Sequence, residues 1–152
     1  MATLQATATL GSGSIVLLCG APGTGKTQMA CEVLIDHCRR GRKGLYARAW
    51  DFLLELKGSF DKPERAPEII GKYSRIGMLV IDEWHRRSQG AWAADQLWNV
   101  VDRRYADLLP TIIVSNGTAA EIAQTFDGAM WDRINEDGGV IECGWKSHRE
   151  TA

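Results

Sequence analysis

Eight residues near the start of the chain have the types and the spacing of a phosphate-binding loop. Residues 20–27, GAPGTGKT, match the pattern GxxxxGK[ST] at every fixed position, after an apolar run and before an amphipathic stretch. The glycines allow successive main-chain N–H groups to point at phosphate oxygens, and a helix that begins here adds its positive N-terminus. Lys26 is expected to reach the β- and γ-phosphates, and the Thr27 hydroxyl to bind Mg²⁺. The predicted nucleotide-binding residues are Gly20, Ala21, Pro22, Gly23, Thr24, Gly25, Lys26, Thr27 and Gln28.

Two adjacent acids, Asp82 and Glu83, follow the apolar run MLVI at 78–81. Hydrolysis of a nucleoside triphosphate needs an acid that holds Mg²⁺ and a group that orients the attacking water. We therefore assign Mg²⁺, held through water, to Asp82 and polarisation of the nucleophilic water to Glu83. Phosphate-loop kinases and signalling GTPases usually lack this second acid, and the chain has no guanine-selecting NKxD motif. ATP hydrolysis is thus favoured over GTP hydrolysis and over phosphoryl transfer.

Asn116 follows another apolar run, at 111–115, much as Glu83 follows its own. We expect its side chain to contact the γ-phosphate from the end of a neighbouring strand. The alternative is a plain turn residue, because Asn116-Gly117 is a strong turn signal.

These side chains must be positioned by strands and helices that alternate along the chain. Short apolar runs alternate with longer amphipathic stretches, which is typical of βα units around a mainly parallel sheet. Thr118 and Glu121 have the spacing of a capping box. We predict strands at 15–19, 45–48, 78–81, 111–115 and 140–143, helices at 26–40, 50–56, 68–73, 91–109 and 118–126, and a loop at 57–67, which contains Gly58, Pro63 and Pro67.

Length and composition limit what can surround this site. The 152 residues amount to one domain, which we divide into a flexible segment at 1–13 and an α/β core at 14–152. Basic and acidic residues nearly cancel, at 18 and 19, so nucleic acid could be bound only through a local patch. No signal peptide or membrane span is readable, and no cysteine lies in a CxxC pair. We expect a cytoplasmic protein with no membrane contact and with reduced, buried thiols.

Taken together, the motifs resemble those of the AAA+ ATPases, and within them the DnaC/DnaI-type replicative helicase loaders and the IstB-like transposition proteins. The resemblance implies a P-loop NTPase fold of three αβα layers, with a five-stranded parallel sheet in the order 5-1-4-3-2 and no substantial helical lid. It also implies ATP and Mg²⁺ as cofactors, and a homo-oligomer that binds single-stranded DNA and a replicative helicase or a transposase. The residues that carry it are GAPGTGKT at 20–27, LVIDE at 79–83, DRRY at 102–105, LPT at 109–111, SN at 115–116, MWDR at 130–133 and WKSHR at 145–149.

The same resemblance assigns roles to three polar residues. Asn116 matches sensor 1, Arg133 matches the arginine finger that acts on a neighbouring subunit's ATP, and Arg149 matches the sensor-2 arginine. Cations at these places would neutralise charge on the transferring phosphoryl group. On the residues alone, Arg133 could instead pair with Asp132 or Glu136 on the surface, and Arg149 could be an ordinary tail residue.

The resemblance also implies where single-stranded DNA would bind. The family binds it partly through elements between the second strand and the strand that ends in the two acids. Lys57, Lys62 and Arg65 lie in this interval together with Phe60, a mixture suited to tracking phosphates and stacking bases. We interpret the other basic clusters, at 39–43, 85–87 and 103–104, as solvated faces. Four functions remain open: a helicase-loader ATPase, an ATPase that assists a transposase, a nucleotide-dependent adaptor with little turnover, and an enzyme that transfers phosphate to a small molecule.

Overall fold

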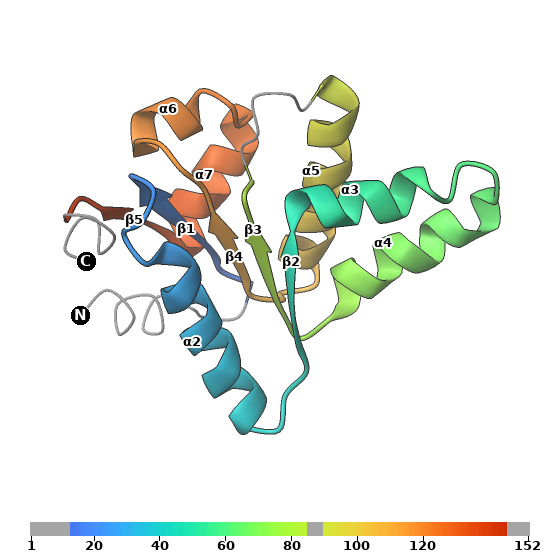
Figure 1. Ribbon diagram of the computed structural model, residues 1–152, viewed down its shortest axis with the longest axis horizontal. Coiled ribbons are helices and arrows are strands. Elements are labelled where there is room, and N and C mark those ends of the chain that lie inside the picture. Colours follow the sequence, from blue (N-terminus) through green and yellow to red (C-terminus); the bar gives the residue numbers. More distant parts are fainter. Residues whose placement is uncertain (1–12, 85–89, 146–152) are drawn as a thin grey trace.

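The computed structural model describes residues 13–84 and 90–145, and within them five strands form one parallel sheet (Figure 1). The strands lie side by side in the order β2-β3-β4-β1-β5. This is the predicted order 5-1-4-3-2 read from the other edge, so the predicted α/β fold is confirmed. The strands are β1 (Ile15–Gly20), β2 (Gly44–Arg48), β3 (Met78–Asp82), β4 (Thr111–Val114) and β5 (Gly139–Cys143).

Helices cover both faces of the sheet. On one face, α2 (Lys26–Arg39) packs Ala30 and Val33 against alternate residues of β1, β3 and β4. The other face carries the larger apolar cluster, to which the remaining helices contribute. These helices are α3 (Ala49–Lys57), α4 (Ala66–Arg75), α5 (Ala91–Ala106), α6 (Ala119–Ala123) and α7 (Gly128–Asp137).

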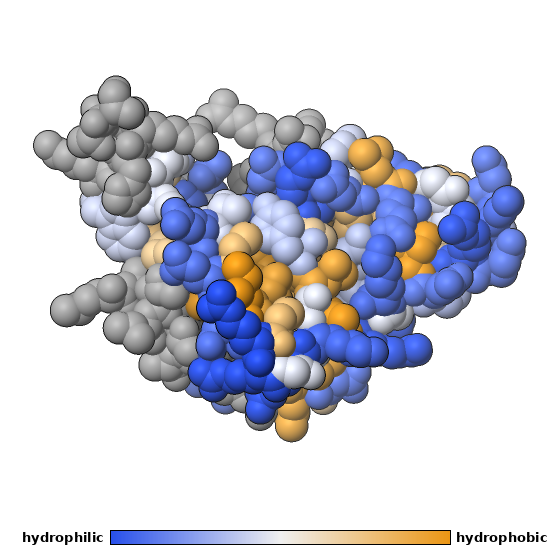
Figure 2. Space-filling view, turned by 60° about the horizontal axis from the view of Figure 1, so that its bottom comes forward, coloured by the Kyte–Doolittle hydropathy of each residue, from blue (hydrophilic) through white to orange (hydrophobic). Residues whose placement is uncertain are grey.

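The three central strands are buried on both faces. Every residue of β1, β3 and β4 is buried, as unbroken apolar runs in a parallel sheet predict. Because these strands are parallel, their carboxyl-terminal ends meet at one edge of the sheet, where polar residues follow each strand. Figure 2, which brings the lower end of Figure 1 forward, shows hydrophobic residues gathered near the middle of that view between hydrophilic ones.

The segment predicted as a loop at 57–67 is partly helical. A short 3-10 helix, η1, spans Pro63–Arg65, and α4 begins at Ala66 with Pro67 in its first turn. Proline at the start of a helix removes an N–H group that has no partner there, so it is compatible with both elements. The prolines therefore mark two helix starts, and the loop prediction was wrong at residue 57, which ends α3, and beyond residue 62.

Helix α7 was not predicted. Its start is fixed by Asp127, whose side chain accepts a hydrogen bond from the Met130 N–H group at 2.8 Å. Met130 and Ile134, one turn apart, are its buried residues. The predicted capping box before α6 is present, since the side chains of Thr118 and Glu121 each accept a main-chain hydrogen bond from the other residue.

One basic cluster is not the solvated face that we predicted. The side chain of Arg104 on α5 is fully buried and donates to five oxygen atoms, while its neighbour Arg103 is exposed. The acceptors of Arg104 are the carbonyl oxygens of Tyr73, Ser74, Ile76 and Pro110, at 2.6–3.3 Å, and Thr111 Oγ1 at 2.9 Å. Burial lowers the pKa of Arg104 to about 10, so it carries its charge at neutral pH.

Three further predictions concern the surroundings of the core. All four cysteines are free, but only Cys19 and Cys143 are buried, so the prediction of buried thiols was wrong for Cys38, which is exposed. In the described ranges, no helix follows β5. Among these same residues, no helix is both long enough and apolar enough to span a bilayer.

Candidate nucleotide-binding site

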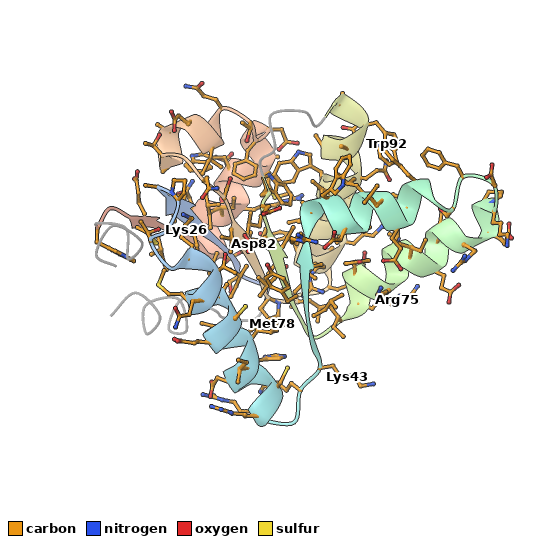
Figure 3. All side chains as sticks on the ribbon, in the orientation of Figure 1. Lys26, Lys43, Arg75, Met78, Asp82 and Trp92 are labelled. Atoms are coloured by element: carbon orange, nitrogen blue, oxygen red, sulfur yellow. The ribbon has the colours of Figure 1, made fainter. Side chains whose placement is uncertain are left out.

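A cavity of about 640 Å³ opens at the carboxyl-terminal edge of the sheet. Figure 3 shows Lys26 and Asp82 at this upper edge, with Met78 at the opposite end of β3. The cavity therefore collects side chains from the residues after β1, β3 and β4, as the sequence predicted. Its lining residues are Pro22, Gly23, Gly25, Lys26, Thr27, Gln28, Asp82, Glu83, Val114, Ser115 and Asn116.

The phosphate loop, residues 20–27, has the conformation that its glycines permit. Gly23 and Gly25 have φ angles of 80° and 83°, in the left-handed region that side chains disfavour. Gly25 is the N-cap of α2 and accepts the first helical hydrogen bond, from the Met29 N–H group, at 3.0 Å. The N-terminal end of α2 is therefore directed at the cavity, where its dipole favours an anion.

Lys26 is buried within the loop and is bound to it. Its Nζ atom donates to the carbonyl oxygens of Gly20 at 2.9 Å and Ala21 at 2.7 Å, and lies 3.3 Å from Thr24 Oγ1. Burial lowers the pKa of Lys26, and the nearby Cys143 and Asp82 oppose this shift. The ammonium group therefore stands inside the curve of the loop, where it can neutralise phosphate oxygens.

Asp82 receives three hydrogen bonds, one from α2, one from β2 and one from the main chain of the next residue. Thr27 Oγ1 and the Tyr46 hydroxyl donate to Oδ2, at 2.7 Å and 2.8 Å, and the Glu83 N–H group donates to Oδ1 at 2.7 Å. The predicted pair of Thr27 and Asp82 is thus in direct contact, although the residues are 55 apart in sequence. Mg²⁺ prefers oxygen ligands and keeps several of its bound waters, so it needs only a few ligands from the protein. The Thr27 hydroxyl and the Asp82 carboxylate are ligands of this kind.

Tyr46 is a site residue that the sequence did not indicate. It lies on β2, and partial desolvation, together with the hydrogen bond that its hydroxyl donates to the Asp82 carboxylate, raises the tyrosine pKa. The hydroxyl is therefore a hydrogen-bond donor at neutral pH. From the sequence, Tyr46 could be placed only within a predicted strand. Its position in a strand does not reveal that its hydroxyl binds Asp82.

Glu83 has a φ angle of 52°, which is rare for a residue with a side chain. The next residue anchors it, because the Trp84 N–H group donates to the Val114 carbonyl oxygen at 3.0 Å and the Trp84 ring is buried. That ring lies 4.8 Å from the Trp98 ring and 6.0 Å from the Phe126 ring, measured between centroids. Packed aromatic rings thus hold the backbone that presents the exposed Glu83 side chain to the cavity.

Asn116 lies two residues after β4 and lines the cavity. The next residue, Gly117, donates to the Gly20 carbonyl oxygen at 3.3 Å and so ties the strand end to the phosphate loop. Gly20 and Ala21 line a neighbouring hollow of about 330 Å³. Trp145 also lines that hollow, and its Nε1–H group donates to the Thr24 carbonyl oxygen at 2.9 Å. Like the contact of Tyr46 with Asp82, this contact was not indicated by the sequence.

Arg133 does not line the cavity of its own chain. Its side chain lies on α7 and forms an ion pair with Asp102 of α5, rather than with Asp132 or Glu136 as the alternative interpretation required. The guanidinium carbon also lies 4.8 Å from the centroid of the Tyr105 ring. Arg149 lies outside the described residues.

The residues predicted to bind DNA lie on the α3–α4 side of the molecule. Lys57 ends α3, Lys62 precedes η1 and Arg65 ends it, and all three are exposed. The Lys57 Nζ atom lies 5.3 Å from the Trp50 ring and 5.5 Å from the Trp92 ring, and Phe60 meets Trp92 edge to face. We call Trp50, Leu54, Lys57, Phe60 and Trp92 the α3 patch. Figure 3 shows Trp92 beside α3, well to the right of Lys26.

Comparisons with known proteins find a matching family of ATP-binding proteins. The family model described as IstB-like ATP binding protein matches residues 1–152. The replicative helicase loader DnaC of Escherichia coli strain K12 is 25% identical over 132 residues, which cover 86% of this chain and 54% of the relative. A putative ATP-binding protein of insertion sequence IS5376 from Geobacillus stearothermophilus is 26% identical over 139 residues, which cover 88% of this chain and 55% of the relative.

A solved structure shares the fold. The crystal structure of the DnaC helicase loader superposes with a TM-score of 0.79 at 20% identity, over 93% of this chain and 85% of the other. The chain spans about half the length of the curated relatives that it matches, at 54% and 55%.

Proposed function

The chain belongs to the IstB-like ATP-binding protein family, and from this premise we propose that it is an AAA+ ATPase of the helicase-loader type. The observation that carries the proposal is the convergence of Lys26, Thr27, Asp82, Glu83 and Asn116 on one cavity at the end of the sheet. These residues come from three separate stretches of the sequence, and each has a chemical part in hydrolysis of a triphosphate.

In the proposed reaction, ATP binds with its phosphates in the curve of residues 20–27. Main-chain N–H groups, the α2 N-terminus and Lys26 would neutralise the phosphate oxygens. Thr27 and Asp82 would hold Mg²⁺, which supplies charge neutralisation and orientation of the phosphates when bound. Glu83 would hold the attacking water and accept its proton, and Asn116 would contact the γ-phosphate.

The proposal includes a role for Arg133 at a neighbouring subunit. Its place on α7, outside the cavity of its own chain, supports an action in trans. The ion pair with Asp102 would then exchange for contacts with the neighbour's phosphates. An arginine supplied in trans raises kcat by about 10³–10⁵-fold in other phosphate-loop enzymes.

We propose single-stranded DNA as the ligand of the α3 patch. Phe60 is 62% exposed and Leu54 is 48% exposed, so the patch presents apolar surface to solvent, with Lys57 between the Trp50 and Trp92 rings. Exposed aromatic rings stack on bases, and Lys57, Lys62 and Arg65 would contact the backbone. A replicative helicase is the partner that the likeness to the DnaC loader supports.

A second candidate is an ATPase that assists a transposase. It is favoured by the family model and by the relative encoded in an insertion sequence. Capture of the purified chain on immobilised replicative helicase, compared with capture on the transposase of an insertion sequence, separates the two candidates, since each predicts binding to one of them.

The ATPase proposal is tested by the rate of phosphate release at increasing protein concentration, with and without single-stranded DNA. We expect the rate per subunit to rise with concentration, because the site is completed by a neighbour, and to rise again with DNA. A low rate that neither concentration nor DNA changes, in protein that binds ATP, would support the adaptor instead. The double variant Phe60→Ala/Trp92→Ala should lose the DNA effect and keep the basal rate.

A further inference from the structure

Tyr46 reaches the candidate Mg²⁺ site from β2, the edge strand of the sheet. It lies two residues before Arg48, the residue that pairs with Asp82 in the β2–β3 ladder. Its hydroxyl lies 2.8 Å from Asp82 Oδ2, the same oxygen atom that accepts the hydrogen bond from Thr27 at 2.7 Å. One carboxylate oxygen therefore accepts hydrogen bonds from two elements, α2 and β2.

The acceptor positions of Asp82 can be counted. A carboxylate offers about four lone-pair positions, two on each oxygen. Thr27 and Tyr46 occupy both positions on Oδ2, and the Glu83 N–H group, 2.7 Å away, occupies one on Oδ1. The fourth position, on Oδ1, is left for a further donor. A water bound to Mg²⁺ is such a donor, and this matches the role that hydrolysis gives to Asp82.

We propose that Tyr46 is a positioning residue for the Mg²⁺ site, which acts by fixing the orientation of the Asp82 carboxylate. By filling Oδ2 it leaves Oδ1 as the atom that faces a metal-bound water. The inference rests on the proposed function, because it presumes that ATP and Mg²⁺ bind in this cavity. Thr27 restrains this oxygen from α2 only, and Tyr46 adds the second restraint, from β2.

The test is the variant Tyr46→Phe, which removes one oxygen atom and keeps the ring. Dissociation constants for a non-hydrolysable ATP analogue are measured with Mg²⁺ and with EDTA, and Mn²⁺ binding to the protein–nucleotide complex is followed by electron paramagnetic resonance. We expect the Mn²⁺ affinity, and the gain in nucleotide affinity that Mg²⁺ brings, to fall about tenfold. Nucleotide affinity in EDTA should equal that of the unmodified chain.

Tyr73→Phe is the matched control. The hydroxyl of Tyr73, on α4, also donates to a carboxylate oxygen, Glu55 Oε2 on α3, at 2.8 Å, but this pair lies outside the candidate site. This variant should leave Mn²⁺ affinity unchanged. Asp82→Asn, alone and combined with Tyr46→Phe, shows whether the Tyr46 hydroxyl acts through Asp82. If it does, adding Tyr46→Phe to the Asp82→Asn protein should cost no further Mn²⁺ affinity. This comparison holds even where Tyr46→Phe lowers the melting temperature.

Two results would overturn the inference while leaving the proposed function intact. One is an unchanged Mn²⁺ affinity in Tyr46→Phe, and the other is an equal loss in Tyr73→Phe. Failure of the unmodified chain to bind the nucleotide with or without Mg²⁺ would overturn the proposed function as well, so the two failures are distinguishable.

Discussion

At the scale of single residues, the backbone of Glu83 has a conformation that residues with a side chain rarely adopt. In the described ranges, Glu83 and Leu108 are the only residues other than glycine with a positive φ angle. Such a conformation costs about 1–3 kcal/mol and persists where the surroundings impose it. At Glu83 the surroundings impose it in two ways. The Glu83 N–H group donates to Asp82 Oδ1, and the next residue, Trp84, is held by its hydrogen bond to Val114. The strained residue is also the one that we assign to the attacking water.

Glu83→Gln should separate hydrolysis from binding. The amide has the shape of the carboxylate but cannot accept a proton from water, so kcat should fall by about 10²-fold or more. ATP affinity should remain within about twofold, because Lys26 and the loop bind the phosphates. Steady-state phosphate release and nucleotide titration measure the two quantities. Glu68→Gln, at an exposed position of α4, is the matched control. A parallel loss of ATP affinity would assign Glu83 to binding instead.

Arg104 should be required for stability and not for chemistry. Arg104→Met would remove the donor of five buried hydrogen bonds near α4, β3 and β4, so the free energy of unfolding should fall by about 3 kcal/mol or more. Arg103→Met, one residue earlier and exposed, should change it by less than about 0.5 kcal/mol. Urea unfolding of both variants measures the difference. Equal stability of the two would mean that the five bonds add nothing net.

Single residues also show how far the sequence could be read. The phosphate loop and the two acids were predictable because their motifs carry the geometry within a few residues. Tyr46 was not, because its contact with Asp82 joins residues 36 apart. Arg104 was predicted wrongly as a surface charge. It follows the buried Leu97 by seven residues and Val101 by three, so its helical phase pointed to the core, and residue type was given more weight than position.

At the scale of elements, strands were easier to predict than helices and loops. The central strands are unbroken apolar runs, whereas α7 begins with glycine and has two buried residues, so its pattern is faint. Asp127 at its N-cap was the available signal. The prolines at 63 and 67 were interpreted as helix breakers, although each stands in a first turn.

The packing of α2 against the start of β3 should make stability depend on pH through His37. Its ring is buried on α2. Burial lowers the pKa of His37 below the 6.5 of a free histidine, and Arg42, Arg104 and Arg40 lower it further against a main-chain hydrogen bond at Lys43. The unfolded chain therefore binds this proton more readily than the folded chain.

Stability should consequently be full above about pH 6.5 and fall as the pH drops toward the lower pKa of the folded state. His37→Gln cannot titrate and should lose this part of the dependence. Urea midpoints of both proteins between pH 7.5 and pH 5 measure it, and the difference between them cancels the contribution of the other histidines. Curves that stay parallel throughout that range would show that His37 does not respond to pH.

At the scale of the whole molecule, the charge arrangement suggests how copies of the chain would share the proposed nucleotide site. The net charge of −1 gives no general attraction for DNA, so several subunits would have to contribute their α3 patches together. Arg133 does not line the cavity of its own chain, and in the single chain it forms an ion pair with Asp102. Both features are explained if the working unit is an assembly of several chains.

Mixing two inactive variants tests this assembly. Lys26→Ala should lose ATP binding but keep Arg133, and Arg133→Ala should bind ATP but have a kcat lowered by about 10³-fold. Each variant alone should thus be nearly inactive. In a mixture, some interfaces join an intact phosphate loop on one chain to an intact arginine on the next, so ATP hydrolysis should reappear. Lys26→Ala/Arg133→Ala supplies neither part and is the control for the mixture.

The rate regained should be greatest near equal amounts of the two variants, because the productive interface needs one chain of each kind. It should also rise with total protein concentration, as assembly does. If Arg133 served its own chain, or only formed the ion pair with Asp102, the Arg133→Ala site would stay defective beside any neighbour. The mixture would then hydrolyse ATP no faster than the two variants measured separately, and the role in trans would be excluded.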